Sequence, residues 1–239
     1  MEGENMKFQI LFASEEHVKY AEEITQAMED AAKARGTGIA KRSPLYISDK
    51  IREGKAVIAL AGTSFAGFCY IETWSHGKYV ANSGLIVLPE YRKGGLAKLI
   101  KAKVFELSRK KFPKSKIFGI TTSLAVMKIN SDLGYKPVTF SELTTDEAFW
   151  KGCQSCTNFD ILTRTGRTHC LCTGMIYDPT EDVQNRQKKQ KNLYERWQLF
   201  LRFLAVRKHK KELLAKKIES RKMENALRLK KKKERMAIS

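Results

Sequence analysis

The spacing of apolar residues predicts two helices near the start of the chain. Ser14 is suited to cap the first helix, which we expect to run to about Arg35 before Gly36 ends it. One face of that helix carries the apolar residues Val18, Ala21, Ile24, Met28 and Ala31. The dipeptide Ser43-Pro44 begins a second, shorter helix that ends near Gly54.

Strands and helices alternate in the middle of the chain. Residues 55–61 and 65–74 predict a hairpin, and residues 78–87 predict the next strand. A helix then continues to about Lys111, with a buried stripe at Leu96, Leu99, Ile100, Val104 and Leu107. The remaining predicted elements are a strand at 116–122, a helix at 124–133, a strand at 138–143, a short helix at 145–150 and a last strand at 170–177. This order predicts an α/β sandwich with a mixed sheet.

A basic, glycine-rich turn separates the strand that ends at Val87 from the helix that follows it. The turn contains Arg92, Lys93, Gly94, Gly95, Leu96 and Ala97. Glycines let the backbone approach an anion, and the free N–H groups at a helix start point toward it. We therefore expect the turn to bind a pyrophosphate, with an ordinary helix start as the alternative. The patterns G-x-G-x-x-G and G-x-x-x-x-G-K-[ST] are absent, which disfavours a dinucleotide site or a P-loop.

Positive charge is concentrated at the C-terminal end of the chain. The formal net charge is +19, and residues 183–239 hold 20 Lys or Arg residues against 5 Asp or Glu residues. Apolar residues recur there at helical spacing: Leu193, Trp197, Phe200, Leu201 and Leu204. We divide the chain into a core at 1–150, a Cys-rich segment with the last strand at 151–180, and a basic helical tail at 181–239.

Three roles fit the basic tail. In the first role the tail binds nucleic acid through phosphates. In the second it lies on an anionic membrane surface through Trp197 and Phe200. In the third role, its apolar stripe docks on the core or on a second subunit, as in a homodimer. Docking is favoured for residues 190–206, and all three roles stay open for residues 207–239.

The sequence contains no secretory signal and no candidate membrane span. Residues 1–8 include acidic side chains and lack an apolar stretch, and no run of about 18 apolar residues occurs. A cytoplasmic location is therefore expected. The five cysteines are not expected to form a disulfide framework in that compartment.

Four cysteines form two close pairs in the Cys-rich segment. Cys153 and Cys156 are separated by two residues, and Cys170 and Cys172 by one. Four soft ligands suit a tetrahedral zinc ion, and two cysteines that are two apart on the predicted last strand share one face. The pattern therefore predicts a structural zinc site, in which His169 is an alternative ligand. The other interpretation is four small core thiols.

The glycine-rich turn resembles a known cofactor-binding motif. The spacing Arg92-x-x-Gly95-x-Ala97 is similar to the acyl-CoA-binding signature of the GNAT family of N-acetyltransferases. Three further segments resemble the acetyltransferase domain of bacterial N-acetylglutamate synthase, namely residues 38–43, residues 78–92, and Thr121-Thr122 with residues 134–138. The resemblance covers roughly residues 6–178. It implies a three-layer αβα sandwich with a mixed, mostly antiparallel sheet, in a stand-alone short form.

The resemblance implies an acyl-CoA-dependent N-acyltransferase that acts on glutamate or a similar small amino acid in arginine biosynthesis. The co-substrate is then acetyl-CoA or another acyl-CoA, for example succinyl-CoA. The acyl-CoA is expected at Ile86, Val87, Arg92, Lys93, Gly94, Gly95, Leu96 and Ala97. The backbone at Ile86 and Val87 would polarise the thioester. The acceptor is expected at Arg42, Lys78, Thr122 and Ser123.

Three positions depart from the family pattern. Ser123 stands where the family has an arginine that grips the glutamate carboxylates, and Asn130 stands where many members place a tyrosine proton donor. The strand around Asn82 lacks the carboxylate that the family often carries there. Glu72 and His76 flank the expected acceptor cleft and are therefore the candidate catalytic bases, although a lone His in a turn is more often a surface residue.

Two other functions stay open. One is a GNAT acyltransferase for a different amine. The other is a nucleic-acid- or ribosome-associated binding protein that keeps only the GNAT scaffold. Removal of residues 207–239 separates these classes, because an enzyme would keep its turnover of small molecules and a binding protein would lose its partner.

Overall fold

The computed structural model describes residues 8–36, 41–181, 194–195, 197–198 and 201. The chain divides into two compact units, residues 1–182 and 183–239. The second unit holds nearly all of the predicted basic tail. Its five described residues, Tyr194, Glu195, Trp197, Gln198 and Leu201, are helical. The other predictions for the tail lie outside the described residues.

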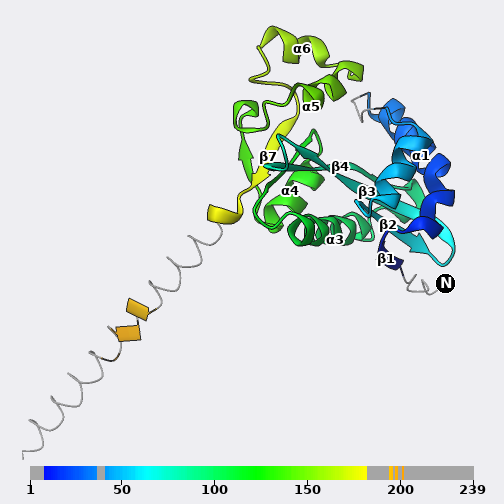
Figure 1. Ribbon diagram of the computed structural model, residues 1–239, viewed down its shortest axis with the longest axis horizontal. Helices are drawn as coiled ribbons and strands as arrows, with labels where there is room; N and C mark the ends of the chain where they lie inside the picture. Colours follow the sequence, from blue (N-terminus) through cyan, green and yellow to red (C-terminus); the bar gives the residue numbers. More distant parts are fainter. Residues whose placement is uncertain (1–7, 37–40, 182–193, 196, 199–200, 202–239) are drawn as a thin grey trace, which may run out of the picture. The chain divides into compact units, whose positions relative to one another are not determined.

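Strands and helices follow one another along the first unit (Figure 1). The strands are β1 (Phe8–Phe12), β2 (Ala56–Ala61), β3 (Ser64–Trp74), β4 (Tyr79–Val87), β5 (Lys116–Thr121), β6 (Lys136–Val138) and β7 (Thr173–Tyr177). The helices are α1 (Ala21–Arg35), α2 (Pro44–Arg52), α3 (Leu96–Lys111), α4 (Leu124–Asp132), α5 (Glu147–Lys151) and α6 (Phe159–Arg164). In the part of the chain that the structure describes, no helix is long and apolar enough to cross a membrane.

The strands form one mixed sheet in the order β1-β2-β3-β4-β5-β7-β6. Strands β4 and β5 pair in parallel, and the other neighbouring pairs are antiparallel. The predicted mixed, mostly antiparallel sheet is therefore confirmed.

Helices cover both faces of the sheet, as Figure 1 shows for α1 and α3. On one face, Ile24 of α1 and Ile47 of α2 pack with strand residues such as Phe68. On the other face, Ile100 and Val104 of α3 pack with a second set of strand side chains. Each layer buries an apolar stripe that would otherwise face water, which stabilises the sandwich. The predicted three-layer αβα architecture is confirmed.

Four local predictions need correction. The first predicted helix begins as a 3₁₀ turn at Glu15–Tyr20 and becomes α-helical only from Ala21. The strand predicted at 138–143 ends at Val138, because Thr139 and Glu142 form a capping box that starts a 3₁₀ turn. The last strand begins at Thr173 rather than at residue 170. The pattern also missed α6 and the edge strand β1, a strand of 5 residues.

Candidate active site

A cavity of about 220 Å³ opens where β4 and β5 separate. The two strands pair only from Tyr79–Ala81 to Lys116–Phe118. Beyond these residues β4 stays paired with β3 and β5 stays paired with β7. Residues 82–85 and 119–122 form the two edges of the resulting gap, and side chains of α3, α4, α5 and α6 also line the cavity.

A β-bulge at Gly84 shapes the β4 lip of the gap. Phe68 pairs with Ile86 and Tyr70 pairs with Ser83, so β4 carries one more residue than β3 between these pairs. Gly84 has a φ of +66°, and a Cβ atom there would lie 2.4 Å from a Tyr70 ring carbon. Glycine is therefore required both for the backbone conformation and for the packing of Tyr70.

The start of α3 presents unused backbone donors to solvent. Gly95 caps the helix with a φ of +81°, and Gly94 and Gly95 face open space. Within the described residues, no backbone hydrogen bond uses the N–H groups of Gly95, Leu96 or Ala97. Such an exposed N-terminus of a 16-residue helix suits an anion such as a pyrophosphate. This is the geometry that the glycine-rich turn predicts.

Arg92 connects this turn to the end of β4. Its Nε atom donates a hydrogen bond of 2.9 Å to the Val87 carbonyl oxygen. The Leu88 N–H donates to the Ala66 oxygen of the neighbouring chain segment. Because successive N–H groups of a strand point to opposite sides, the Val87 N–H points away from β3. Of the two predicted backbone donors, Val87 is thus better placed than Ile86 to face the gap.

Glu72 is a buried carboxylate in the wall of the cavity. It is 9% exposed and accepts a hydrogen bond from the Tyr46 hydroxyl of α2. One carboxylate oxygen, Oε1, lies 3.7 Å from Lys50 Nζ, and the other, Oε2, lies 3.8 Å from Arg42 Nη2. Arg42 also donates from Nε to the Tyr70 hydroxyl at 3.0 Å. The site therefore combines a candidate base with a guanidinium, both inside one cavity.

The two tyrosines near Glu72 stay protonated at neutral pH. Burial raises the pKa of Tyr70 to about 12, despite the opposing effect of Arg42. Burial, followed by the neighbouring Tyr70 and Glu72, raises the pKa of Tyr46 strongly as well. Because Tyr46 stays protonated, its hydroxyl donates a hydrogen bond to the Glu72 carboxylate and orients it.

The other residues predicted for the acceptor lie in different places. Thr122 lines the cavity, whereas the Ser123 side chain caps α4 by accepting from the Val126 N–H. His76 and Lys78 are exposed and lie in the turn between β3 and β4. Neither residue lines the cavity. Of the two candidate bases, Glu72 alone faces the cavity.

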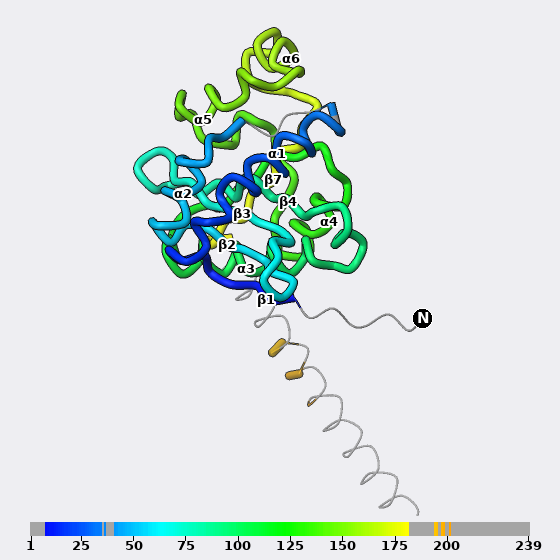
Figure 2. Tube along the Cα trace, turned by 90° about the vertical axis from the view of Figure 1, so that its right-hand side faces the viewer, coloured from blue at the N-terminus to red at the C-terminus, as the bar shows by residue number. Residues whose placement is uncertain are grey.

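The Cys-rich segment closes one end of the cavity. Helices α5 and α6 lie together at one end of the unit (Figure 2). Asn158, Phe159 and Leu162 of this segment line the cavity, as does Phe149 of α5. Local sequence patterns did not predict this apolar, aromatic lid, because the packing of α6 against distant parts of the chain leaves no local signal.

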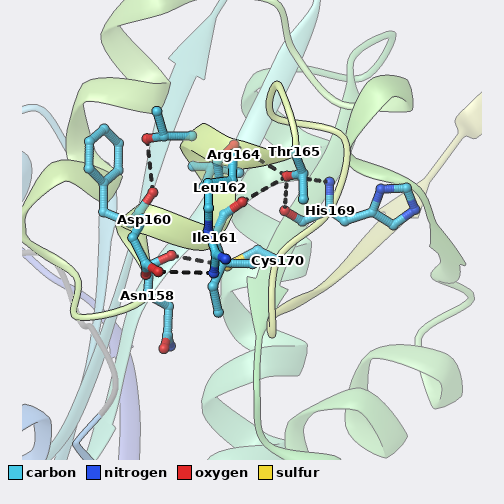
Figure 3. A network of polar contacts seen from close by, with 10 residues as sticks. Asn158, Asp160, Ile161, Leu162, Arg164, Thr165, His169 and Cys170 are labelled. Atoms are coloured by element: carbon cyan, nitrogen blue, oxygen red, sulfur yellow. Dashed lines mark hydrogen bonds and ion pairs between the residues drawn. The ribbon is translucent and has the colours of Figure 1, made fainter.

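Polar contacts of Thr165 fix the loop after α6 (Figure 3). Its hydroxyl lies 2.9 Å from the Ile161 oxygen and 2.7 Å from the His169 oxygen. The Cys170 thiol lies 3.9 Å from the Asn158 oxygen, a weak contact of the same network. Residues 170–172 therefore belong to this loop rather than to the predicted strand, and Cys170 lines the cavity.

The four cysteines that form two close pairs in the sequence lie at the cavity, and all four are free thiols. Cys153, Cys156, Cys170 and Cys172 all line it and are partly buried. Burial, and then the neighbouring thiols, raise the pKa of Cys153 to about 11 and that of Cys172 to about 12. Among the described residues no group of three or more His, Cys, Asp or Glu side chains is arranged to hold a metal ion.

The structure therefore does not support the predicted zinc site. His169, the alternative ligand, is exposed and contacts Thr168. Cys170 and Cys172 precede β7 and do not share a strand face. Three of the four thiols, those of Cys153, Cys170 and Cys172, pack against the apolar cluster around Trp150.

The structure contains three buried polar side-chain atoms without a hydrogen-bond partner in its described part, and all three belong to residues of this cavity. They are Trp74 Nε1, Asn130 Oδ1 and Asn158 Nδ2. A buried polar atom without a partner costs free energy, so such atoms mark places where a ligand or water completes the bonding. The cavity is thus equipped to bind a polar molecule.

Sequence comparisons identify no relative. No model of a protein family matches the chain, and no curated protein matches it. Solved structures do match, at low sequence identity. N-acetylglutamate synthase from Neisseria gonorrhoeae, complexed with coenzyme A and N-acetyl-glutamate, is 15% identical with a TM-score of 0.52. The match covers 74% of this chain and 36% of that one, so the chain corresponds to about a third of the synthase.

Two shorter proteins match over nearly their whole length. Rv2747 from Mycobacterium tuberculosis, in complex with CoA, is 13% identical with a TM-score of 0.51 and covers 71% of this chain and 98% of that one. The putative acetyltransferase yncA from Salmonella typhimurium, with acetyl-CoA, is 13% identical with a TM-score of 0.51 and covers 72% and 94%. These likenesses show that the first unit has the fold of the GNAT acetyltransferases.

Proposed function

We propose that this protein is an acyl-CoA-dependent N-acyltransferase that transfers an acetyl or other acyl group to the amine of a small amino acid. One observation carries the proposal. The gap between β4 and β5 holds a cavity with a buried carboxylate, Glu72, and residues 88–95 connect the open end of β4 to the exposed start of α3. Solved neighbours with this fold contain CoA or acetyl-CoA, which agrees with such a use of the gap.

The residues at the start of α3 fit the pyrophosphate of an acyl-CoA. Three N–H groups, those of Gly95, Leu96 and Ala97, have no backbone partner among the described residues, and no atom fills the space above Gly94 and Gly95. Arg92 and Lys93 add positive charge beside them. The acyl arm would then enter the gap, where β4 offers backbone groups that β5 leaves unpaired.

Acyl transfer needs a neutral amine, a polarised thioester and an exit for a proton. In the proposed reaction the amine attacks the thioester carbon, the carbon–sulfur bond breaks, and its electron pair leaves with the sulfur. Glu72 accepts the proton that the amine loses, directly or through one water. Tyr46 holds the carboxylate in place, and the Val87 N–H polarises the carbonyl.

We further propose glutamate or a similar small amino acid as the acceptor, which would place the reaction in arginine biosynthesis. Arg42 supports this, because its guanidinium lines the cavity and suits a carboxylate. The Neisseria synthase was solved with N-acetyl-glutamate, the product that such a reaction would give.

The experiment is an acyl-transfer assay with acetyl-CoA and a panel of amino acids, in which mass spectrometry identifies the product. The Glu72→Gln variant should lose most turnover and keep its CoA affinity. The matched control is Glu53→Gln, since Glu53 follows α2, pairs with Lys55 and does not line the cavity. Absence of acyl transfer to any amine by the wild-type chain would contradict the proposal.

A further inference from the structure

We propose that Lys101 binds a carboxylate carried by a substrate, and that the terminal carboxylate of a dicarboxylic acyl group on CoA is its source. Succinyl-CoA represents this class of donor. The inference rests on the proposed acyl-CoA function and names the acyl group that the site would select. A carboxylate of the acceptor amino acid offers the same chemistry, and the experiment below separates the two sources.

Lys101 is a lysine inside the protein rather than on its surface. It belongs to α3, is 2% exposed and lines the cavity. Lysine is seldom fully buried without a charged partner. Its Nζ atom lies 3.4 Å from Asn82 Oδ1 and 5.4 Å from the centre of the Tyr135 ring. Lys101 makes no ion pair with any residue that the structure describes.

The groups that face Lys101 are uncharged. Burial raises the pKa of the Cys69 thiol on β3 to about 11 and holds the pKa of the Tyr135 phenol well above its usual value. Asn82 is an amide, and its Nδ2 atom donates a hydrogen bond of 2.8 Å to the Ser108 hydroxyl oxygen. Burial accordingly lowers the pKa of Lys101. A carboxylate that entered the cavity would supply the counter-charge that the protein lacks here.

Lys101 lies at the closed end of the gap between the strands. Its contact residue Asn82 directly follows Ala81, the last β4 residue that pairs with β5. Lys101 is six residues after Gly95, which places it roughly 9 Å along the helix from the expected pyrophosphate site. An arm that enters at the open end points its acyl group toward this closed end, so the tip of the acyl chain would meet the ammonium.

Asn130 supports a polar ligand at the same cavity. Its side chain is 1% exposed, and its Oδ1 atom has no hydrogen-bond partner among the described residues. The Nδ2 atom makes only a long contact of 3.7 Å with Met175 Sδ. A purely apolar acyl group would leave the ammonium without a counter-charge and this oxygen without a partner, whereas a carboxylate or another polar ligand can supply what is missing.

The first arm of the experiment compares succinyl-CoA with butyryl-CoA, which differ at the acyl tip by a carboxylate against a methyl group. We expect wild-type protein to bind succinyl-CoA about ten- to a hundredfold more tightly in calorimetry. Lys101→Met should abolish this preference, and Lys101→Arg should retain part of it. The control Lys103→Met removes a half-buried cation of the same helix that pairs with Glu106 and does not line the cavity, and it should leave the preference unchanged.

The second arm compares glutamate with glutamine as acceptor, in the presence of acetyl-CoA. If Lys101→Met changes this preference and not the preference among donors, the carboxylate belongs to the acceptor, and dicarboxylic donors are excluded. If wild-type protein binds both donors equally and Lys101→Met alters neither preference, the inference is wrong, and Lys101 has a structural role. If neither CoA nor any acyl-CoA binds, the proposed function itself fails. The donor comparison on wild-type protein remains decisive should Lys101→Met not fold.

Discussion

The Tyr46 hydroxyl of α2 donates a hydrogen bond to the Glu72 carboxylate of β3. This contact links the helical layer to the sheet at the cavity wall, and Lys50 and Arg42 each lie near one oxygen of the carboxylate. A fixed orientation is what a carboxylate needs if it is to accept a proton from a bound amine.

Tyr46→Phe should therefore reduce acyl transfer without affecting acyl-CoA binding. A hydrogen bond to a charged group contributes about 1.5–3 kcal/mol, so we expect kcat/KM for the amine to fall by roughly one to two orders of magnitude. The control is Tyr20→Phe, which removes a hydroxyl bonded to the Thr63 oxygen. Equal losses in the two variants would show that Tyr46 acts through general stability rather than through Glu72.

Arg42→Ala should raise the KM for an acidic acceptor by about one to two orders of magnitude, because a charge-assisted contact is lost. The KM for acyl-CoA should change little. Lys78 was the second cation predicted for the acceptor, yet it is exposed and does not line the cavity. Lys78→Ala should therefore leave both KM values unchanged, and an unmoved acceptor KM in Arg42→Ala would argue against a carboxylate acceptor.

Gly84→Ala should destabilise the protein and distort the gap. The new Cβ atom would clash with Tyr70 and with Met28, whose Cε atom lies 2.8 Å away, in addition to the strain of a positive φ. We expect the free energy of unfolding to fall by about 2–5 kcal/mol. Gly62→Ala has a similar φ and open space around it, so it should cost only about 1 kcal/mol. Similar denaturation midpoints for both variants would show that the bulge tolerates a side chain.

The raised pKa values of Cys153 and Cys172 predict slow alkylation at neutral pH. The thiolate is the reactive form, so with pKa values of about 11 and 12 the rate with iodoacetamide should still rise about tenfold per pH unit from pH 7 to 9. Peptide mass spectrometry measures each site separately. A rate that levels off below pH 9 would show that these thiols ionise more readily than their burial implies.

Local patterns were sufficient for much of the fold and for the conformation of the glycine-rich turn before α3. Pro44 and Ser43 begin α2 as predicted, and the Ser43 side chain accepts from the Tyr46 N–H. The segment from Val87 to Ala97 forms a strand end, a turn and a helix start, because proline, glycine and basic residues impose this arrangement locally.

The chemistry inside the cavity depends on contacts between distant segments and could not be read from spacing. The helical pattern predicted Leu99 in the buried stripe of α3, but it is 49% exposed, whereas Lys101 is buried. Lys101 is buried because it lines the cavity at the gap between β4 and β5, where its ammonium contacts Asn82. The thiols of the Cys-rich segment similarly meet through tertiary packing and not through a shared strand.

The most direct test of acyl-CoA binding is a calorimetric titration of CoA into wild-type protein and into Gly95→Glu. The glutamate would fill the open space at the start of α3 and place a negative charge beside the expected pyrophosphate. Gly77→Glu, at φ +80° in the turn between β3 and β4, controls for backbone strain. We expect wild-type protein and Gly77→Glu to bind CoA and Gly95→Glu to lose binding. Equal affinity in all three proteins would contradict the assignment of this turn.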